Sequence, residues 1–188
     1  MVLINDQYRI MITAKSMPSL EDYTVLYIPD NLDLRDFYSA RLVKIEPKAD
    51  QTSFLTMVER ITSDTDFCAV LEKHILTVIL FETILQIDLK KGSVIRCVHC
   101  ENIGGLEQIH TVDNGYIIKG ESDIFRYDYA LNRIWRFRAR DIFASPTNDV
   151  CFWMDNNVIH CRDWKGWHYM LNLDGKLIHE ELEKSPLS

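Results

Sequence analysis

From residue 66 to the C-terminus, short segments of alternating apolar and polar residues are separated by turn signals. The alternation is clearest in segments 84–89 and 124–129, and it continues in 94–97 and 134–137. A period of two is typical of β-strands that bury one face, and polar or glycine-containing breaks between such strands indicate hairpins. The pattern therefore predicts an all-β chain of successive hairpins.

The turns between these segments recur at a constant distance along the chain. Three sets can be superposed: 72–74, 113–115 and 155–157; 82–83, 121–123 and 165–166; 91–92, 131–132 and 174–175. The spacing within each set is roughly 40 residues, a period that indicates repeat architecture. We therefore predict a propeller-like array of four-stranded antiparallel units. The units are 66–102, 103–141 and 142–183, followed by a tail at 184–188.

The first 65 residues fit the repeat less well. Segments 23–28, 41–45 and 54–58 predict three strands of a degenerate fourth unit. Segment 8–13 predicts a separate strand that would close a ring beside the last unit, and 32–39 predicts a short helical stretch. We expect one β domain over the whole chain, arranged as a closed small propeller, an open arc or a β-sandwich with blade-like hairpins.

The third strand, the turn and the fourth strand of each unit carry a family resemblance. Residues 85–95 and 125–137 resemble the L-D-x-x-T-G-x-x-x-W stretch of quinoprotein-like (PQQ/WD40-type) β-propeller repeats, and the second of these copies keeps the tryptophan, Trp135. Arg96 and His179 stand at that position in the other copies. The resemblance covers residues 66–188. It implies blade-like units and carries no cofactor-binding residues to this chain.

Composition and charge narrow the function classes. The chain has a net charge of −7, which argues against general binding of nucleic acid or anionic membranes. No apolar run approaches the ~20 residues that cross a bilayer, and the N-terminus lacks the order of a signal peptide. We expect a cytoplasmic protein that binds neither nucleic acid nor membrane.

The five cysteines agree with a reducing compartment, because their number is odd and most lie in strand-like segments. Cys151 and Cys161 are symmetric about Asn156. A tight hairpin there would place them opposite each other as two packed thiols.

A zinc site is an alternative for one of the cysteine segments. Cys97, His99 and Cys100 have C-x-x-C spacing with an intervening histidine, and His110 is a nearby candidate ligand. Structural zinc sites use four such ligands, commonly from two pairs, and there is no second C-x-x-C here. A strand end with buried thiols explains the same residues, so we expect no cofactor and keep zinc as the alternative.

Catalytic motifs are absent from the sequence. There is no nucleophile elbow, phosphate-binding loop or dinucleotide-binding glycine pattern. His160 and Cys161 are neighbours, so a strand would point them to opposite faces and keep them from acting as base and nucleophile. The sequence therefore favours a protein without enzymatic activity.

Arginines concentrate in one segment of this acidic chain. Arg136, Arg138 and Arg140 occupy alternate positions, so a strand would present all three on one face. Such a face would meet an acidic partner or a phosphate. It would equally serve as the charged solvent face of an outer strand.

A second candidate binding segment is aromatic. Asp163, Trp164 and Trp167 surround a tight turn. Exposed, the tryptophans would form a binding platform; otherwise they would pack over the end of a hairpin.

The functional expectation is a non-catalytic protein-interaction module of the cytoplasm with a protein partner. An inhibitor or immunity-type partner is one version of it. The alternative is a small-molecule- or metal-binding protein, or an enzyme, with its site near the propeller axis. Its residues would be the cysteines and histidines of the zinc alternative. Fold alone does not decide between them.

Overall fold

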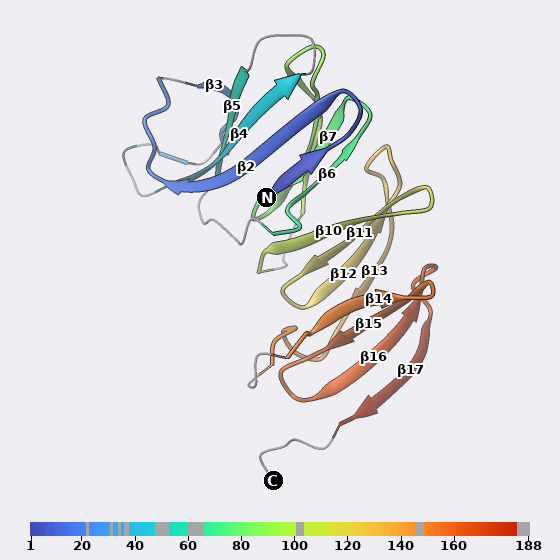
Figure 1. The fold of residues 1–188 in the computed structure, drawn as a ribbon. Coiled ribbons are helices and arrows are strands. Elements are labelled where there is room, and N and C mark those ends of the chain that lie inside the picture. Colours follow the sequence, from blue (N-terminus) through green and yellow to red (C-terminus); the bar gives the residue numbers. More distant parts are fainter. Residues whose placement is uncertain are drawn as a thin grey trace. The chain divides into compact units, whose positions relative to one another are not determined.

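The computed structural model is built entirely from β-strands in the part of the chain it describes (Figure 1). The described residues are 1–21, 23–30, 32–33, 35, 38–47, 53–59, 66–100, 104–145 and 149–183. None of these segments forms a helix long and apolar enough to cross a membrane. The all-β prediction is confirmed.

Three of the four sheets are built alike, each from four consecutive strands that hydrogen-bond in chain order (Figure 1). The second sheet comprises β6 (Ala69–Glu72), β7 (Ile75–Ile79), β8 (Thr83–Asp88) and β9 (Ser93–His99). The third comprises β10 (Leu106–Val112), β11 (Gly115–Gly120), β12 (Asp123–Tyr127) and β13 (Arg133–Arg138). The fourth comprises β14 (Phe152–Asp155), β15 (Val158–Arg162), β16 (Trp167–Asn172) and β17 (Leu177–Leu182). These four-stranded sheets confirm the predicted propeller-like units.

The three sheets also repeat their irregularities. In each, the pairing of the third and fourth strands shifts register once: at Gln86/Ile87, Arg126/Tyr127 and Met170/Leu171. The turn after the third strand contains one residue with positive φ in each sheet: Gly92, Leu131 and Gly175. A bulge bends a strand and increases its twist. The units therefore share a local geometry as well as a strand count.

The hairpin between β14 and β15 corrects the prediction for two cysteines. Its turn, Asn156 and Asn157, has φ values of 48° and 63°, as a two-residue type I′ turn requires. Because the turn has two residues, Cys161 lies opposite Phe152, and Cys151 is not its partner across the ladder. Cys161 is buried and Cys151 is half-buried, and none of the five cysteines, all of which lie in described segments, forms a disulfide.

The N-terminal sheet departs from the repeat. Its five strands are β1 (Val2–Ile4), β2 (Tyr8–Ser16), β3 (Thr24–Tyr27), β4 (Ser39–Pro47) and β5 (Ser53–Glu59). Their order is β1-β2-β4-β5-β3, and the edge strand β3 runs parallel to β5. The three strands predicted for a degenerate unit are present and share this sheet.

Strand β2 corrects the prediction made for residues 8–13. It pairs with β4 over nine positions, from Tyr8 opposite Pro47 to Ser16 opposite Ser39. It therefore lies inside the N-terminal sheet, where both of its edges are already paired, with β1 and β4. Alternating buried residues in both strands, such as Ile10 and Val43, place their apolar faces in one core. The predicted helical stretch 32–39 lies partly outside the described residues, and β4 begins at Ser39.

The chain divides into two compact units, Met1–His110 and Thr111–Ser188. In the second unit, an apolar core joins residues of the third and fourth sheets: Ile117, Ile124, Ala139, Phe143, Phe152, Ile159, Cys161, Tyr169 and Leu171. In the first unit, the buried residues include an ion pair between Arg41 and Glu59, whose side chains are 0% and 2% exposed.

Candidate functional site

Two of the predicted arginines converge on one carboxylate of the third sheet. Asp123 Oδ1 accepts hydrogen bonds from Nε of Arg136 (2.6 Å) and Nε of Arg138 (3.1 Å). A second nitrogen of Arg138 donates to Oδ2 at 3.2 Å. Burial opposes ionisation of Asp123, but the two arginines outweigh it and lower the pKa of the carboxyl. Two guanidinium groups against one carboxylate leave a net positive charge at this edge.

Arg140 lies beyond the end of β13 and has different partners. Its guanidinium carbon lies 3.7 Å from the centroid of the Trp167 ring, a cation–π contact. The same group donates to both carboxylate oxygens of Glu180, at 3.0 and 3.1 Å. Its backbone N–H donates to the Tyr169 hydroxyl at 3.2 Å. The three arginines are therefore split between Asp123 and the fourth sheet.

Asp163 is a turn-forming residue and is 2% exposed. Its Oδ1 accepts hydrogen bonds from the backbone N–H groups of Lys165 and Trp167, both at 3.0 Å. Its Oδ2 accepts one from the Tyr169 hydroxyl at 2.7 Å. Burial, together with this bond, raises the pKa of Tyr169. The carboxylate thus holds the β15–β16 turn and keeps Trp167 in place, and it does not face solvent.

Trp164 projects from the same turn and is 52% exposed. Its backbone N–H donates to the carbonyl of Ile142 at 2.8 Å. Trp167 lies opposite Leu182 across the β16–β17 ladder, and both Ile142 and Leu182 are exposed. We call Arg140, Ile142, Trp164, Trp167 and Leu182 the aromatic turn surface.

The first unit contains a groove of about 710 Å³. Its lining comes from β3, the residues after it, the end of β5, the β7–β8 connection and β9: Leu26, Tyr27, Ile28, Pro29, Asp30, Glu59, Leu80, Phe81, Glu82, Thr83, Cys97 and His99. Three of these residues, Asp30, Glu59 and Glu82, are acidic, and none is lysine or arginine. The groove thus combines apolar walls with negative charge.

Glu59 is the buried acid of this groove. Its Oε1 lies 3.2 Å from Nε of Arg41, and its Oε2 accepts a hydrogen bond from the Phe81 N–H at 3.0 Å. Burial raises the pKa of Glu59 to about 7, although Arg41 and this hydrogen bond oppose the shift.

The four residues of the zinc alternative are not gathered around one point in the described structure. Cys97 and His99 line the groove, while Cys100 is buried and its N–H donates to the carbonyl of Glu82 at 2.7 Å. His110 stacks on Phe67 with a centroid distance of 5.3 Å. Burial and the charge of Asp30 also raise the pKa of Cys97, which disfavours the metal-binding thiolate.

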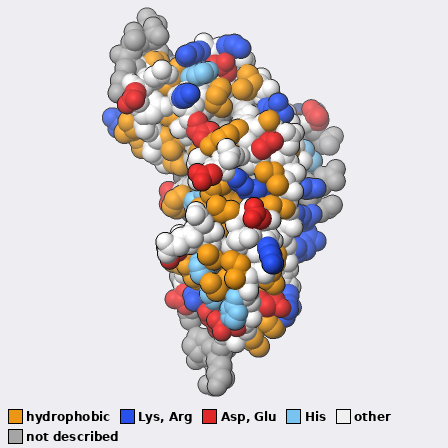
Figure 2. All heavy atoms as spheres, turned by 90° about the vertical axis from the view of Figure 1, so that its right-hand side faces the viewer, with side chains coloured by type: hydrophobic (Ala, Val, Ile, Leu, Met, Phe, Trp, Pro, Cys, Tyr) orange, Lys and Arg blue, Asp and Glu red, His pale blue; other side chains and the backbone are white. Residues whose placement is uncertain are grey.

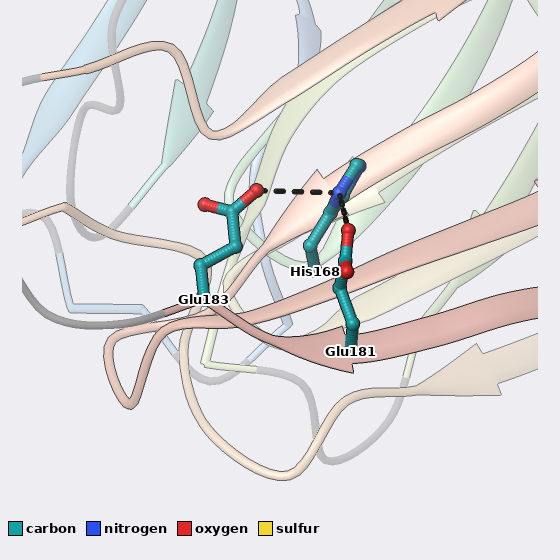
Figure 3. Close-up of side chains that lie close together, drawn as sticks. All are labelled: His168, Glu181 and Glu183. Carbon is teal, nitrogen blue, oxygen red and sulfur yellow. Dashed lines mark ion pairs between the residues drawn. The ribbon is translucent and has the colours of Figure 1, made fainter.

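Sequence reasoning missed a different cluster of potential ligands, formed by His168, Glu181 and Glu183 (Figure 3). His168 lies opposite Glu181 across the β16–β17 ladder. That register depends on the shift after Met170, so the residue order alone does not reveal the pairing. The prediction for His160 and Cys161 is confirmed, because Cys161 lies in the core cluster whereas His160 stacks on Trp153.

The surface that Figure 2 displays is mixed in character. Hydrophobic, acidic, basic and histidine side chains alternate over it, without one continuous area of a single kind. A binding surface on this face would therefore depend on a few projecting side chains.

No protein-family model matches the chain, and no curated protein matches it. Solved structures do. BamB from Moraxella catarrhalis matches with a TM-score of 0.51 and 15% identity, over 85% of this chain and 49% of that one. The Neurospora crassa Pan2 WD40 domain matches with a TM-score of 0.48 and 15% identity, over 63% and 38%.

The computationally designed Ika4 protein matches with a TM-score of 0.46 and 12% identity, over 65% of this chain and 75% of that one. The chain spans about half or less of the BamB and Pan2 structures. At these identities the likeness shows the fold alone, and that fold is a propeller-like repeat array, as the resemblance implied.

Proposed function

We propose that this chain is a non-catalytic protein-interaction module that binds its partner through the aromatic turn surface. The observation that carries the proposal is the exposure of Trp164, whose side chain is 52% exposed. It lies in a turn that is fixed by backbone hydrogen bonds to the buried carboxylate of Asp163. Tryptophan and arginine dominate binding hot spots. A turn that is already ordered loses little further conformational entropy on binding.

The cations near this surface are paired within the chain, which indicates what kind of partner it would bind. Arg140 is bound to Glu180 and Lys165 to Asp141 (3.1 Å), so both surface cations have an acidic partner within the chain. The exposed side chains between them are apolar. The matching partner is a protein segment that inserts an apolar side chain beside Trp164, with polar groups around it.

Free thiols support a reducing compartment such as the cytoplasm, since Cys161 and Cys68 are buried and unbridged. An inhibitor or immunity-type protein is one version of this proposal.

The test is affinity capture of a partner by the tagged full chain, followed by quantification of its binding to purified variants. Trp164→Ala combined with Leu182→Ser should weaken binding at least about tenfold, the effect of losing one hot spot. Ile134→Ser is the matched control, because Ile134 is 57% exposed on the neighbouring sheet. Equal binding by all three proteins, each folded by circular dichroism, contradicts the proposal.

A second candidate function rests on the acidic groove of the first unit. Its volume of about 710 Å³ lies in the range of small-molecule sites. Glu59 is already paired with Arg41, but the carboxylates of Asp30 and Glu82 favour a cation with an apolar body. We propose a small aromatic or aliphatic amine as its ligand. Phenethylamine should raise the unfolding temperature of wild type more than its neutral analogue 2-phenylethanol does, and Asp30→Asn/Glu82→Gln should remove that difference. Equal effects of the two compounds on wild type contradict this candidate.

A further inference from the structure

One face of the fourth sheet carries imidazoles and carboxylates on three adjacent strands. His160 lies on β15, His168 on β16 and Glu181 on β17, with Glu183 just beyond the end of β17. The other face of the sheet packs into the apolar core. The strand register therefore collects the polar groups on the face away from that core.

Three of these groups point at one another (Figure 3). Nδ1 of His168 lies 3.4 Å from Oε1 of Glu183 and 3.8 Å from Oε1 of Glu181. The three ligand atoms lie within 4.8 Å of one another. Ligands bound at about 2.0–2.2 Å to one tetrahedral ion are about 3.3–3.6 Å apart. The observed spacing approaches that of three ligands on a single ion.

His168 is held in an orientation that suits a ligand. It is 8% exposed, and its Nε2 lies 3.2 Å from Nδ1 of His160. Trp153 stacks on both imidazoles, with centroid distances of 4.8 Å to His160 and 5.4 Å to His168. Histidine ligands commonly donate their second ring N–H to an outer acceptor, which fixes the orientation of the ring.

A cation resolves the charge problem of this arrangement. When Nε2–H of His168 donates to His160, Nδ1 presents a lone pair to two carboxylates. In this tautomer three acceptors face one another, and a positive ion between them would remove their repulsion.

The two carboxylates also have outer partners. Oε2 of Glu181 lies 3.7 Å from Nε2 of His179. Oε1 of Glu183 accepts hydrogen bonds from Arg162 at 3.0 and 3.2 Å. A carboxylate has about four acceptor positions, so Glu183 can bind Arg162 and an ion together. The single positive charge of Arg162 leaves one negative charge on this group of carboxylates for a divalent ion to offset.

We propose that His168, Glu181 and Glu183 bind a divalent transition-metal ion, with His160, His179 and Arg162 as the outer partners of the three ligands. The mixed nitrogen and oxygen donors select zinc and its neighbours over magnesium or calcium, which prefer oxygen ligands alone. Water would fill the remaining coordination. The ligands alternate along β16 and β17 with Trp167 and Leu182 of the aromatic turn surface, so their side chains lie on the opposite face of the sheet. The cysteines of the zinc alternative belong to the other unit.

The test is isothermal titration of the full chain with zinc chloride at pH 7.5, with cobalt(II) absorption as a second readout of the coordination. Wild type should bind about one ion per chain at this site. Glu181→Gln/Glu183→Gln should bind more than about 100-fold more weakly. His160→Ala should bind about 10- to 100-fold more weakly, as expected for an outer partner.

Two comparisons make the result decisive. His168→Ala should lose the cobalt(II) spectrum, whereas Cys97→Ser/His99→Ala in the other unit should keep it. Unchanged binding in the two-glutamine variant overturns the proposal. So does loss of binding in the Cys97/His99 variant, or a wild type that binds no zinc. The glutamine variant keeps the side-chain shape at two half-exposed positions, and its unfolding midpoint shows whether the fold is retained.

Discussion

The N-terminal sheet and the repeat sheets each bury a carboxylate, and they compensate it differently. Glu59 of the N-terminal sheet is 2% exposed and faces one equally buried arginine, Arg41. Asp123 of the third sheet is 0% exposed, yet its two arginines, Arg136 and Arg138, are 28% and 54% exposed. In the third sheet, the arginines that pair with the buried carboxylate are therefore partly exposed to solvent. The N-terminal sheet encloses both partners.

The N-terminal sheet, which compensates its buried carboxylate differently, also departs from the four-stranded repeat in its strand count and order. In the four-stranded sheets, short strands and a shared bulge place polar groups at turns and edges. In the N-terminal sheet, β2 and β4 pair without interruption over nine positions, and the additional strand β3 contributes to one wall of the groove. The groove depends on β3, a strand that the four-stranded sheets do not have. The aromatic turn surface lies at the β15–β16 turn of a four-stranded sheet.

The largest effect is expected for Glu59→Ala. At pH 8, where Glu59 is ionised, removing it leaves the buried Arg41 as an uncompensated charge, which costs about 3–5 kcal/mol. All four tryptophans, at positions 135, 153, 164 and 167, lie in the second unit. Urea unfolding followed by far-ultraviolet circular dichroism should therefore show an earlier transition, while tryptophan fluorescence keeps its midpoint. A shift of less than about 1 kcal/mol would show that the pair is not buried as described.

The next largest effect is a pH dependence of the free energy of unfolding, caused by the carboxyl of Glu59. Burial raises the pKa of Glu59 to about 7 in the folded chain, above its ordinary value of 4.5, so the native state holds this proton through a pH range where the unfolded state has lost it. Its contribution to stability is therefore full below about pH 4.5 and falls as the pH rises to about 7. The loss is on the order of 3 kcal/mol.

Glu59→Gln removes this titration. The free energy of unfolding, measured by circular dichroism at pH 5 and pH 8, should decrease in wild type by that much more than in the variant. Parallel pH profiles for the two proteins would contradict the shift.

The sequence predicts the four-stranded sheets better than the N-terminal sheet, for a physical reason. Hairpins depend on neighbouring residues, so alternation and turn chemistry predict the repeat units from residue 66 onward. The pairing of β2 with β4 joins distant segments, and local patterns do not encode it. Register decides the rest: the two-residue turn places Phe152, and not Cys151, opposite Cys161, and the shift after Met170 sets which residues face His168.

A smaller effect is expected within the repeat sheets, at Gly115. Its φ is +143°, and a Cβ there would lie 2.1 Å from the carbonyl oxygen of Tyr127. Gly115→Ala must therefore displace β12, and should destabilise by roughly 2–3 kcal/mol, within the usual range for a disruptive substitution. Gly92→Ala is the matched control, because its φ is +62° but nothing lies within 4 Å of the added Cβ.

Gly92→Ala should cost about 1 kcal/mol, the backbone strain alone. Thermal unfolding of both variants measures the difference. Equal costs at the two glycines would mean that the close approach of Tyr127 does not constrain the sheet.

The smallest effect is expected for Arg138→Ala, and it tests how the repeat compensates its buried carboxylate. Arg138 is 54% exposed, and Asp123 keeps its 2.6 Å bond to Arg136 when Arg138 is removed. The single substitution should cost less than about 1 kcal/mol, as for other exposed ion pairs. Arg136→Ala/Arg138→Ala leaves Asp123 without either arginine, and should cost more than the two single changes together. A double-mutant cycle by urea unfolding measures that excess. Additive costs would mean that the two arginines act independently, and that the repeat sheets are no better protected against loss of a cation than the N-terminal sheet.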